Sequence, residues 1–506
     1  MTSRDVRLSW GVFALLLFSF AYFYQAGGWN ENTRFDLVRA IVDDHTLAID
    51  RYHENTGDEA SYGGHYYSDK APGLSLFTVP LYALVRLFRG AFATEHDFIV
   101  VATYLSTILT VGVAGAATGA LVYRAGRRLG ATPVGALIAC TGYGLGTIVF
   151  PFSTMFFGHQ LAAFLLFFAF ILAWECKDAP ARWKSACVPL ALGAAVLVEM
   201  PTAPAALGLL GYHLGFKPSR RTLLVAAVAA LPVLGLAAYL MSAFGSPLRV
   251  GYDLLANPAS RDEMHTHGLF GLTYPHIGVI AELLLGRYRG LLPYSPILLL
   301  AIPGFLVALS REITSDDAPE VIHEERRRAS KVALYVCVYF VLFVSSYTWW
   351  QGGSSFGSRH LVPMLPFFAT PIALVASRRP GLGLALLLPS IAVMLIVTSV
   401  QPKVSDRFHN PFWAGLLPAF LDGVIAANDV CPVIGQIGVR AHENFLRQAR
   451  HDAFNLGMLL GNGTPRSLAP LIAIWLSSAW GLGRAARKEP SDALQAEGGS
   501  ATLKTS

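Results

Sequence analysis

The stretch LAAFLLFFAFILAW, from Leu161 to Trp174, contains no charged residue and decides the fold class. A helix crosses the hydrocarbon core of a bilayer when it offers about 20 mostly apolar residues, and this stretch supplies most of such a helix. Similar stretches recur along the whole chain. Of the 506 residues, 54% are hydrophobic and 14% are charged, with a mean hydropathy of +0.47, whereas soluble domains carry about 25% charged residues. The sequence therefore predicts an all-α, polytopic membrane protein.

Twelve apolar stretches are predicted to be transmembrane helices. A further run, Gly73–Phe88, is only about four turns long and carries Arg86 and Arg89 at its end, which is typical of an amphipathic helix in the membrane interface. We therefore expect extracytoplasmic juxtamembrane helices beside the spans. The twelve stretches are Ser9–Tyr24, Phe98–Tyr123, Ala131–Phe150, Leu161–Trp174, Ala186–Val198, Ala203–Phe216, Leu223–Phe244, Leu291–Ser310, Val332–Tyr347, Leu361–Ser377, Gly381–Val400 and Ser467–Gly483.

The basic residues between the predicted spans indicate the topology, because Lys and Arg in short loops mark the cytoplasmic side. If Gly73–Phe88 does not cross the bilayer, every basic cluster falls on the side of the N-terminus. This predicts a multi-pass protein of the plasma (inner) membrane with a cytoplasmic N-terminus. The net charge of +6 then follows from topology, and no nucleic-acid partner is predicted.

The first external segment is the most informative part of the chain. Residues 30–44 are predicted to form a short amphipathic helix, with Glu31 close to the outer end of the first span. A carboxylate at this depth can act as a general base toward a substrate carried by a lipid. A plain interfacial helix with solvated charges is the alternative interpretation.

Several basic side chains are predicted to lie at the membrane surface. Lys70 follows Asp69, and its ammonium can meet a lipid phosphate there, or it pairs with Asp69 or extends toward water. Arg359 ends a turn rich in Gly and Ser and opens a span, where an unpaired Arg opposes the helix dipole and an anion is a suitable partner. Arg287 and Arg289 lie just before another span.

Trp349 and Trp350 precede the turn that leads to Arg359. Paired Trp residues are either interface anchors or surfaces on which a sugar can stack. The external placement of these residues suits both interpretations.

Three segments, taken in this order, resemble motifs of the lipid-linked-sugar glycosyltransferases of the GT-C superfamily, in particular protein O-mannosyltransferases and bacterial aminoarabinose transferases. Glu31-Asn32-Thr33-Arg34-Phe35 is similar to an Asp-Glu-x-Arg-Tyr pattern in the first external loop, with Glu for the first Asp and Asn for the second acid. Asp69-Lys70-Ala71-Pro72 is similar to a Lys-Pro-Pro-like loop, and Ser355–Arg359 to a Gly-Arg turn before a late span.

The resemblance implies that Glu31 is the catalytic carboxylate, with Asp36, Asp43 and Asp44 as rivals because the motif departs from the family pattern. It implies a GT-C-like transmembrane catalytic module over residues 1–400, with its first external loop at 25–97. Residues 401–483 are predicted to hold an external helical segment and the last transmembrane helix, and residues 484–506 a disordered cytoplasmic tail. The candidate substrate-binding residues are Arg34, Asp69, Lys70, Arg287, Arg289, Trp350 and Arg359.

The implied function is transfer of a hexosyl or pentosyl group from a polyprenyl-phosphate donor, in contact with membrane lipid, to a glycan, lipid or protein acceptor at the extracytoplasmic face. A carboxylate takes the proton of the acceptor, the anomeric centre inverts, and fixed cations stabilise the leaving phosphate. No metal or other cofactor is predicted, because the five Cys form no CxxC pair and no Asp-x-Asp pair stands out.

Other functions fit parts of the pattern. A flippase or transporter for a lipid-linked sugar needs polar residues along its spans or inverted repeats, and the sequence shows neither. In a polymer ligase of cell-envelope assembly, the key basic residues would lie in a late external loop. Arg440, Arg447 and Arg450 lie in such a predicted loop. A non-catalytic assembly factor would use residues 401–466 as a docking surface.

Overall fold

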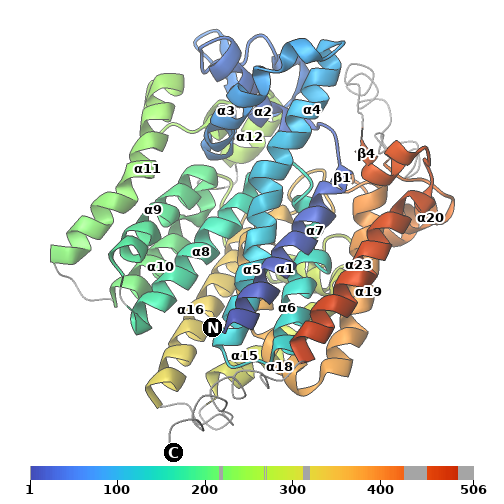
Figure 1. Cartoon of the computed structure of the whole chain (residues 1–506). Coiled ribbons are helices and arrows are strands. Elements are labelled where there is room, and N and C mark those ends of the chain that lie inside the picture. The colour runs from blue at the N-terminus through green and yellow to red at the C-terminus, as the bar shows by residue number, and fades with distance from the viewer. Residues whose placement is uncertain are drawn as a thin grey trace, which may run out of the picture.

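A computed structural model of the chain shows an almost entirely helical protein (Figure 1). Strands are short and pair only in twos within the described residues: β1 (Phe23–Tyr24) with β4 (Phe454–Asn455), and β2 (Glu59–Tyr62) with β3 (His65–Ser68). The predicted all-α class is confirmed. The structure describes residues 2–179, 181–215, 220–266, 268, 270–310, 320–426 and 453–487.

Each of the twelve predicted spans coincides with a helix or with consecutive helices. In the described part of the chain, five helices are long and apolar enough to cross a membrane, or six if a pair bent by 46° is one span. The helices are α1 (Ser3–Ala21), α4 (Glu95–Thr107) with η3 (Ile108–Gly112) and α5 (Val113–Arg128), α6 (Pro133–Leu145), α8 (Gly158–Asp178), α9 (Arg182–Val198), α10 (Ala203–Leu214), α11 (Arg220–Phe244), α14 (Leu291–Tyr294) with η6 (Pro296–Leu300) and α15 (Ala301–Leu309), α16 (Glu320–Ser345), η7 (Arg359–Met364) with α17 (Leu365–Ala369) and α18 (Ile372–Arg378), α19 (Pro380–Val400) and α23 (Ala469–Arg487).

Glycines let the central helices approach one another closely. A Cβ on Gly119 of α5 would lie 2.2 Å from Cδ1 of Leu16 on α1. A Cβ on Gly126 would lie 2.8 Å from Cβ of Ala373 on α18. Because lipid tails are as apolar as the side chains, membrane helices associate through such close packing and not through the hydrophobic effect.

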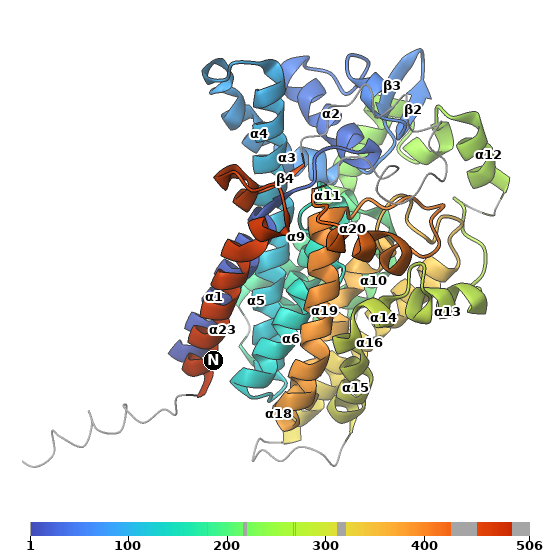
Figure 2. The same ribbon diagram turned by 90° about the vertical axis from the view of Figure 1, so that its right-hand side faces the viewer.

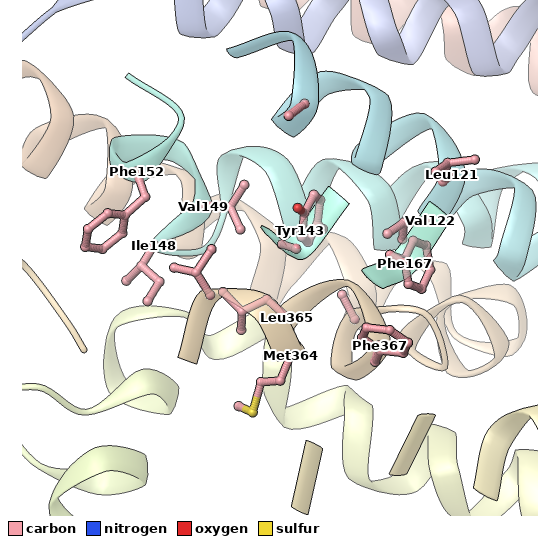
Figure 3. Packing of buried hydrophobic residues seen from close by; sticks show 14 of the residues in the cluster. Leu121, Val122, Tyr143, Ile148, Val149, Phe152, Phe167, Met364, Leu365 and Phe367 are labelled. Atoms are coloured by element: carbon pink, nitrogen blue, oxygen red, sulfur yellow. The ribbon is translucent and has the colours of Figure 1, made fainter. Parts of the chain in front are cut away.

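Large apolar side chains fill the space between these helices. Figure 3 shows Val122 of α5, Tyr143 of α6, Phe167 of α8 and Phe367 of α17 around one seam, with Phe152 of the short α7 (Val149–Phe152) farther along it. All five are buried. A close-packed interior of this kind holds the helix ends in fixed positions.

The connecting segments gather at one end of the bundle, which we name the loop end. It carries β2, β3, α2 (Trp29–Asp43), α3 (Gly73–Arg86) and α12 (Pro258–Thr266) (Figures 1 and 2). The helix α3 is the structural counterpart of the ambiguous run Gly73–Phe88, and it packs against α2. The N-terminus of α1 lies at the opposite end (Figure 1).

A second apolar cluster fixes the first loop segment to the end of α11. Leu37 of α2 and Ile49 pack with Tyr239, Leu240 and Phe244 of α11, and all five are buried. This burial holds α2 in place although its own sequence is only weakly amphipathic. The position of α2 therefore depends on tertiary packing.

The last described segment returns to the start of the chain. The hydroxyl of Tyr22 donates to the carbonyl of Ser467 at 2.6 Å, and the indole of Trp475 on α23 donates to Oγ of Ser19 at 2.8 Å. The division at residue 400 stays a prediction, as does the tail at 484–506, of which only α23 up to Arg487 is described. Arg440, Arg447 and Arg450 lie outside the described residues.

Replacing Gly193 of α9 by Ala is expected to destabilise the bundle. The new Cβ would lie 2.2 Å from the backbone carbonyl oxygen of Ala229 on α11, and a backbone atom cannot move away cheaply. We expect a loss of about 1–3 kcal/mol of stability, measured as a lower unfolding temperature of the purified protein in detergent.

The matched control is Gly235→Ala on α11, where the new Cβ meets nothing within 4 Å. Since Ala favours a helix over Gly by about 1 kcal/mol, this variant should be as stable as the parent or more so. Equal effects of the two substitutions would contradict close α9–α11 packing at Gly193.

Candidate functional site

Segments that are far apart in the sequence meet at the loop end, and they bring charged side chains into a largely buried setting. The buried or half-buried ionisable residues include Glu31, Arg34, Asp69, Lys70 and Arg289. The contributing segments are α2, the loop 53–72, the start of α8, the corner after α9 at 199–202, the loop 244–260, the segment 286–290, the turn 347–360 and residues 401–404.

Glu31 lies in the first turn of α2 and is only 5% exposed. Its Oε1 is 3.7 Å from Nζ of Lys403, a residue that follows α19. The same Nζ donates to the carbonyl oxygens of Gln25, Ala26 and Gly27 at 2.7, 3.2 and 2.6 Å. One ammonium group thus holds the corner between α1 and α2 and faces the carboxyl group at the start of α2.

Burial raises the pKa of Glu31, and the charges of Lys403 and Arg359 act in the opposite direction. A carboxyl group with a raised pKa binds a proton more readily near neutral pH than an ordinary glutamate does. This property suits a general base that takes a proton from a hydroxyl or amine.

Arg34 is fully occupied by protein groups. Its Nη2 is 2.8 Å from Oε1 of Glu199, its Nε donates to Oδ1 of Asn30 at 3.1 Å, and its side chain is 2% exposed. Glu199 also faces Nδ1 of His159 at 3.6 Å, and Nε2 of His159 lies 3.4 Å from Nδ1 of His360. Arg34 therefore positions α2 against α9, and its role as a substrate-binding residue stays a prediction.

Lys70 is buried between two carboxylates. Its Nζ lies 2.8 Å from Asp69 and 3.0 Å from Asp58, and 5.1 Å from the ring centre of Tyr252. Burial alone would lower the pKa of Lys70, but the two carboxylates raise it, so this residue stays cationic. Burial raises the pKa of Asp69 to about 6, whereas Lys70 outweighs burial and lowers that of Asp58.

A pocket of about 520 Å³ opens beside this triad, and we name it the Trp pocket. Trp29 and Trp349 line it together with Asp58, Asp69 and Lys70. A larger cavity of about 970 Å³ lies far from this chemistry, among the basic residues of α16 and α18 at the opposite end. Size alone therefore does not mark the site.

Arg359 and Arg289 flank the glycine turn of residues 352–353. A Cβ on Gly353 would lie 3.6 Å from Nη1 of Arg359, and Nη2 of Arg289 donates to the Gly353 carbonyl at 3.0 Å. Both glycines have positive φ, 78° and 69°, a conformation that side chains disfavour. The turn can therefore pass directly along the guanidinium groups.

The two guanidinium groups are incompletely satisfied within the described residues. Arg289 is 1% exposed, yet its Nε and Nη1 have no hydrogen-bond partner there, and neither has the buried Nε of Arg359. Burial lowers the pKa of Arg289, and the positive charge of Arg359 acts in the same direction. An anion between them would supply the missing acceptors and remove the repulsion.

Four further predicted site residues make other contacts. Asp44, at the far end of α2, pairs with Arg51 at 3.0 Å. Arg287 is exposed, whereas Trp350 packs edge-on against Tyr288 with ring centres 6.0 Å apart. Asp36 is buried on α2 and accepts a hydrogen bond from Asn55 at 3.2 Å.

Asp58 and Lys403 belong to the site, although neither was expected there from the sequence. Asp58 stands in a polar loop with many acids, and Lys403 is a single lysine after a span, so neither carried a motif. Glu199 offered a signal, because it is a rare acid next to an apolar run. Among the residues that the structure describes, no three His, Cys, Asp or Glu side chains gather as metal ligands do.

No protein-family model matches the chain, and no curated protein matches it. The chain is similar to two crystal structures of ArnT from Cupriavidus metallidurans, one in the apo state and one bound to undecaprenyl phosphate. Sequence identity is 13% in both comparisons, which cover 95% of this chain and 75% and 76% of those chains, with TM-scores of 0.47 and 0.43. Similarity at this level leaves the function of this chain to be inferred from its own residues.

Replacing Asp36 by Asn is expected to stabilise the protein at high pH. Burial raises the pKa of Asp36 from 3.8 to about 7, so the stability of the parent falls as pH rises from about 4 to 7 and stays low above that. Asn cannot ionise, and the variant should therefore exceed the parent in unfolding temperature by more at pH 8.5 than at pH 5.

Activity measured on the same samples separates two roles of Asp36. A folded Asp36→Asn protein that retains activity leaves Glu31 as the base. A folded but inactive protein would make Asp36 the base, and an unchanged pH dependence of unfolding would show that Asp36 titrates normally.

Proposed function

We propose that this chain is a membrane glycosyltransferase that moves a sugar from a polyprenyl-phosphate donor to an acceptor at the loop end. The observation that carries the proposal is the guanidinium of Arg289, which is buried and has two nitrogen atoms without an acceptor among the described residues. Such a group favours an anionic ligand, because a buried donor without a partner costs about 1–3 kcal/mol, and more when it is charged.

The surroundings favour a phosphate that is attached to a lipid. Arg289 directly precedes the apolar segments α14, η6 and α15, and Arg359 begins the bent pair that counts as a membrane span. An anion held here lies where the apolar helices end, at the depth of lipid headgroups. The planar donor fork of Arg matches phosphate oxygens.

In the proposed reaction, Glu31 takes the proton from the acceptor hydroxyl or amine. The acceptor atom forms a bond to the anomeric carbon, and the bond from that carbon to the phosphate oxygen breaks. The electron pair leaves with the polyprenyl phosphate, whose developing charge Arg289 and Arg359 stabilise. A single attack inverts the anomeric configuration.

The distribution of charge supports an extracytoplasmic position of the loop end. A cavity of about 540 Å³ at the other end is lined by Arg124, Arg127, Arg128 and Lys184, with Asp5 and Glu175 as their acidic neighbours. An excess of basic residues marks the cytoplasmic side. We therefore place the N-terminus in the cytoplasm and the site outside.

Glu31→Gln is expected to lower the rate of transfer by about 10²–10⁴ while donor binding is retained. Gln keeps the size of the side chain but cannot accept the acceptor's proton. The assay incubates the purified protein in vesicles with radiolabelled polyprenyl-phosphate sugars and a panel of glycan, lipid and peptide acceptors.

The control is Glu54→Gln, which changes an exposed carboxylate of the same loop and should leave the rate unchanged. Full activity of the Glu31 variant would remove Glu31 as the base. Movement of the intact donor across the vesicle membrane without transfer would favour a flippase.

Arg289→Ala and Arg359→Ala are each expected to lower turnover by about 10²–10³, the typical cost of removing one group that stabilises a transition-state charge. Donor binding should weaken as well, measured as retention of radiolabelled polyprenyl phosphate. The exposed Arg407 provides the control variant Arg407→Ala. Parent-like donor binding and turnover in both variants would contradict a phosphate site.

A further inference from the structure

The Trp pocket offers two indole surfaces that the proposed chemistry at Glu31, Arg289 and Arg359 does not use. Trp29 and Trp349 both line this pocket of about 520 Å³, a volume within the range of small-molecule sites, about 300–1,000 Å³. Trp29 is 42% exposed despite its size. Concave ligand sites are commonly lined by aromatic side chains.

Both rings are held by their surroundings. The backbone of Gly57 lies against Trp29, since a Cβ on Gly57 would be 3.0 Å from three atoms of the ring. Trp349 packs against Tyr252 and Tyr347, with ring centres 6.4 and 6.5 Å apart. Rigid aromatic rings provide contact area at a low cost in conformational entropy.

Indole faces suit the C–H surfaces of sugar rings. The face of an aromatic ring is electronegative, whereas hydrogen atoms on carbons next to oxygen are electropositive. A ligand that presents such C–H groups toward Trp and hydroxyl groups toward carboxylates therefore matches the pocket.

An acceptor for sugar hydroxyls is available in the wall of the pocket. Asp69 is 2% exposed, and its Oδ1 is buried without a hydrogen-bond partner among the described residues. Its other oxygen is bound by Lys70. A hydroxyl that donates to Oδ1 would satisfy the remaining acceptor.

The charges of the pocket exclude an anionic ligand. Asp58, Glu59 and Asp69 line it with a single cation, Lys70, so the wall is net negative. A phosphate or carboxylate would be repelled by this surplus. Lys70 already pairs with both Asp58 and Asp69, and Oδ1 of Asp69 remains as an acceptor for a hydroxyl donor.

We infer that the Trp pocket is the acceptor subsite and that it binds an uncharged saccharide between Trp29 and Trp349. The role of this pocket as an acceptor subsite rests on the proposed function, whereas saccharide binding by the pocket does not. The pocket is built by the loops around residues 57–70 and 255–260, which lie on the outward side of the loop end (Figure 2). An acceptor that arrives from the aqueous phase meets these loops first.

The first experiment measures saccharide binding without any donor. The protein in nanodiscs is titrated with the neutral sugars maltotriose, mannotriose and triacetylchitotriose by isothermal calorimetry. Glucose 6-phosphate and the deacetylated glucosamine trimer serve as the anionic and cationic probes. We expect at least one neutral trisaccharide to bind and the phosphorylated sugar not to bind. Binding of none of the neutral sugars, or tighter binding of either charged probe, would overturn the inference.

The second experiment uses variants of the two rings. Trp349→Ala and Trp29→Ala should weaken binding of the neutral saccharide by about tenfold or more, and Trp349→Phe should restore part of it, because it keeps an aromatic face. Trp183→Ala, which removes an exposed ring at the start of α9, should have no effect. Unchanged affinity in both Ala variants, with monodisperse gel filtration, would show that the indoles do not form the site.

Donor binding is the readout that separates this inference from the proposed function. The Trp variants should bind radiolabelled polyprenyl phosphate as the parent does and should raise KM for a saccharide acceptor more than they lower kcat. If the parent binds the saccharide but does not bind polyprenyl phosphate, the transferase is rejected and the saccharide site is kept. The reverse pattern would reject the saccharide site alone.

Discussion

The candidate site depends on one ammonium group, the Nζ of Lys403, which joins the corner between α1 and α2 to the segment after α19. It donates to three successive backbone carbonyls at the corner between α1 and α2 and faces Glu31 at 3.7 Å. Burial lowers the pKa of Lys403, while the charge of Glu31 raises it. Without this contact the corner would leave three carbonyl oxygens short of a donor, and the start of α2 would lose its link to the segment after α19.

Other buried charges at the loop end are also paired with groups of opposite charge or with hydrogen-bond acceptors. Arg34 is satisfied by Glu199 and Asn30, and Lys70 by Asp58 and Asp69. A buried ion pair of this kind contributes little net stability, because desolvation offsets most of the attraction. Removing one member is costly, because it leaves the other charge buried without a partner. Their main effect is to fix where α2 and the loop 53–72 lie. Arg289 differs from these pairs, because two nitrogen atoms of its buried guanidinium lack an acceptor among the described residues.

Two neighbouring regions thus have separate roles in the proposed reaction, one for the donor phosphate and one for the acceptor sugar. The guanidinium groups beside Gly353 offer a cationic surface at the ends of apolar helices, whereas the Trp pocket is aromatic and net acidic. A lipid phosphate suits the first and an uncharged sugar the second. Glu31 feels the charges of both Arg359 and Asp58, which is the setting a base needs when it serves an acceptor beside a departing phosphate.

The sequence alone determined the membrane class, the twelve apolar stretches and a helix at residues 30–44, because hydrophobicity and helical periodicity are local properties. It also pointed to Glu31, Lys70 and Arg359 as candidates through short motifs. It placed Glu31 ahead of Asp36, Asp43 and Asp44 only through a partial motif match, since all four lie on one short segment and differ in what packs around them.

Only the tertiary structure decided which charges meet. Asp58 meets Lys70 across the β2–β3 hairpin, and Lys403 reaches Glu31 across most of the chain, with no signal in the intervening sequence. Burial of α2 against α11 fixes its rotation, and this rotation turns Asp36 toward Asn55 and leaves Asp44 with Arg51 at the surface. Contacts of this kind arise from long-range packing, whose energy depends on pairs of residues that no local pattern can relate.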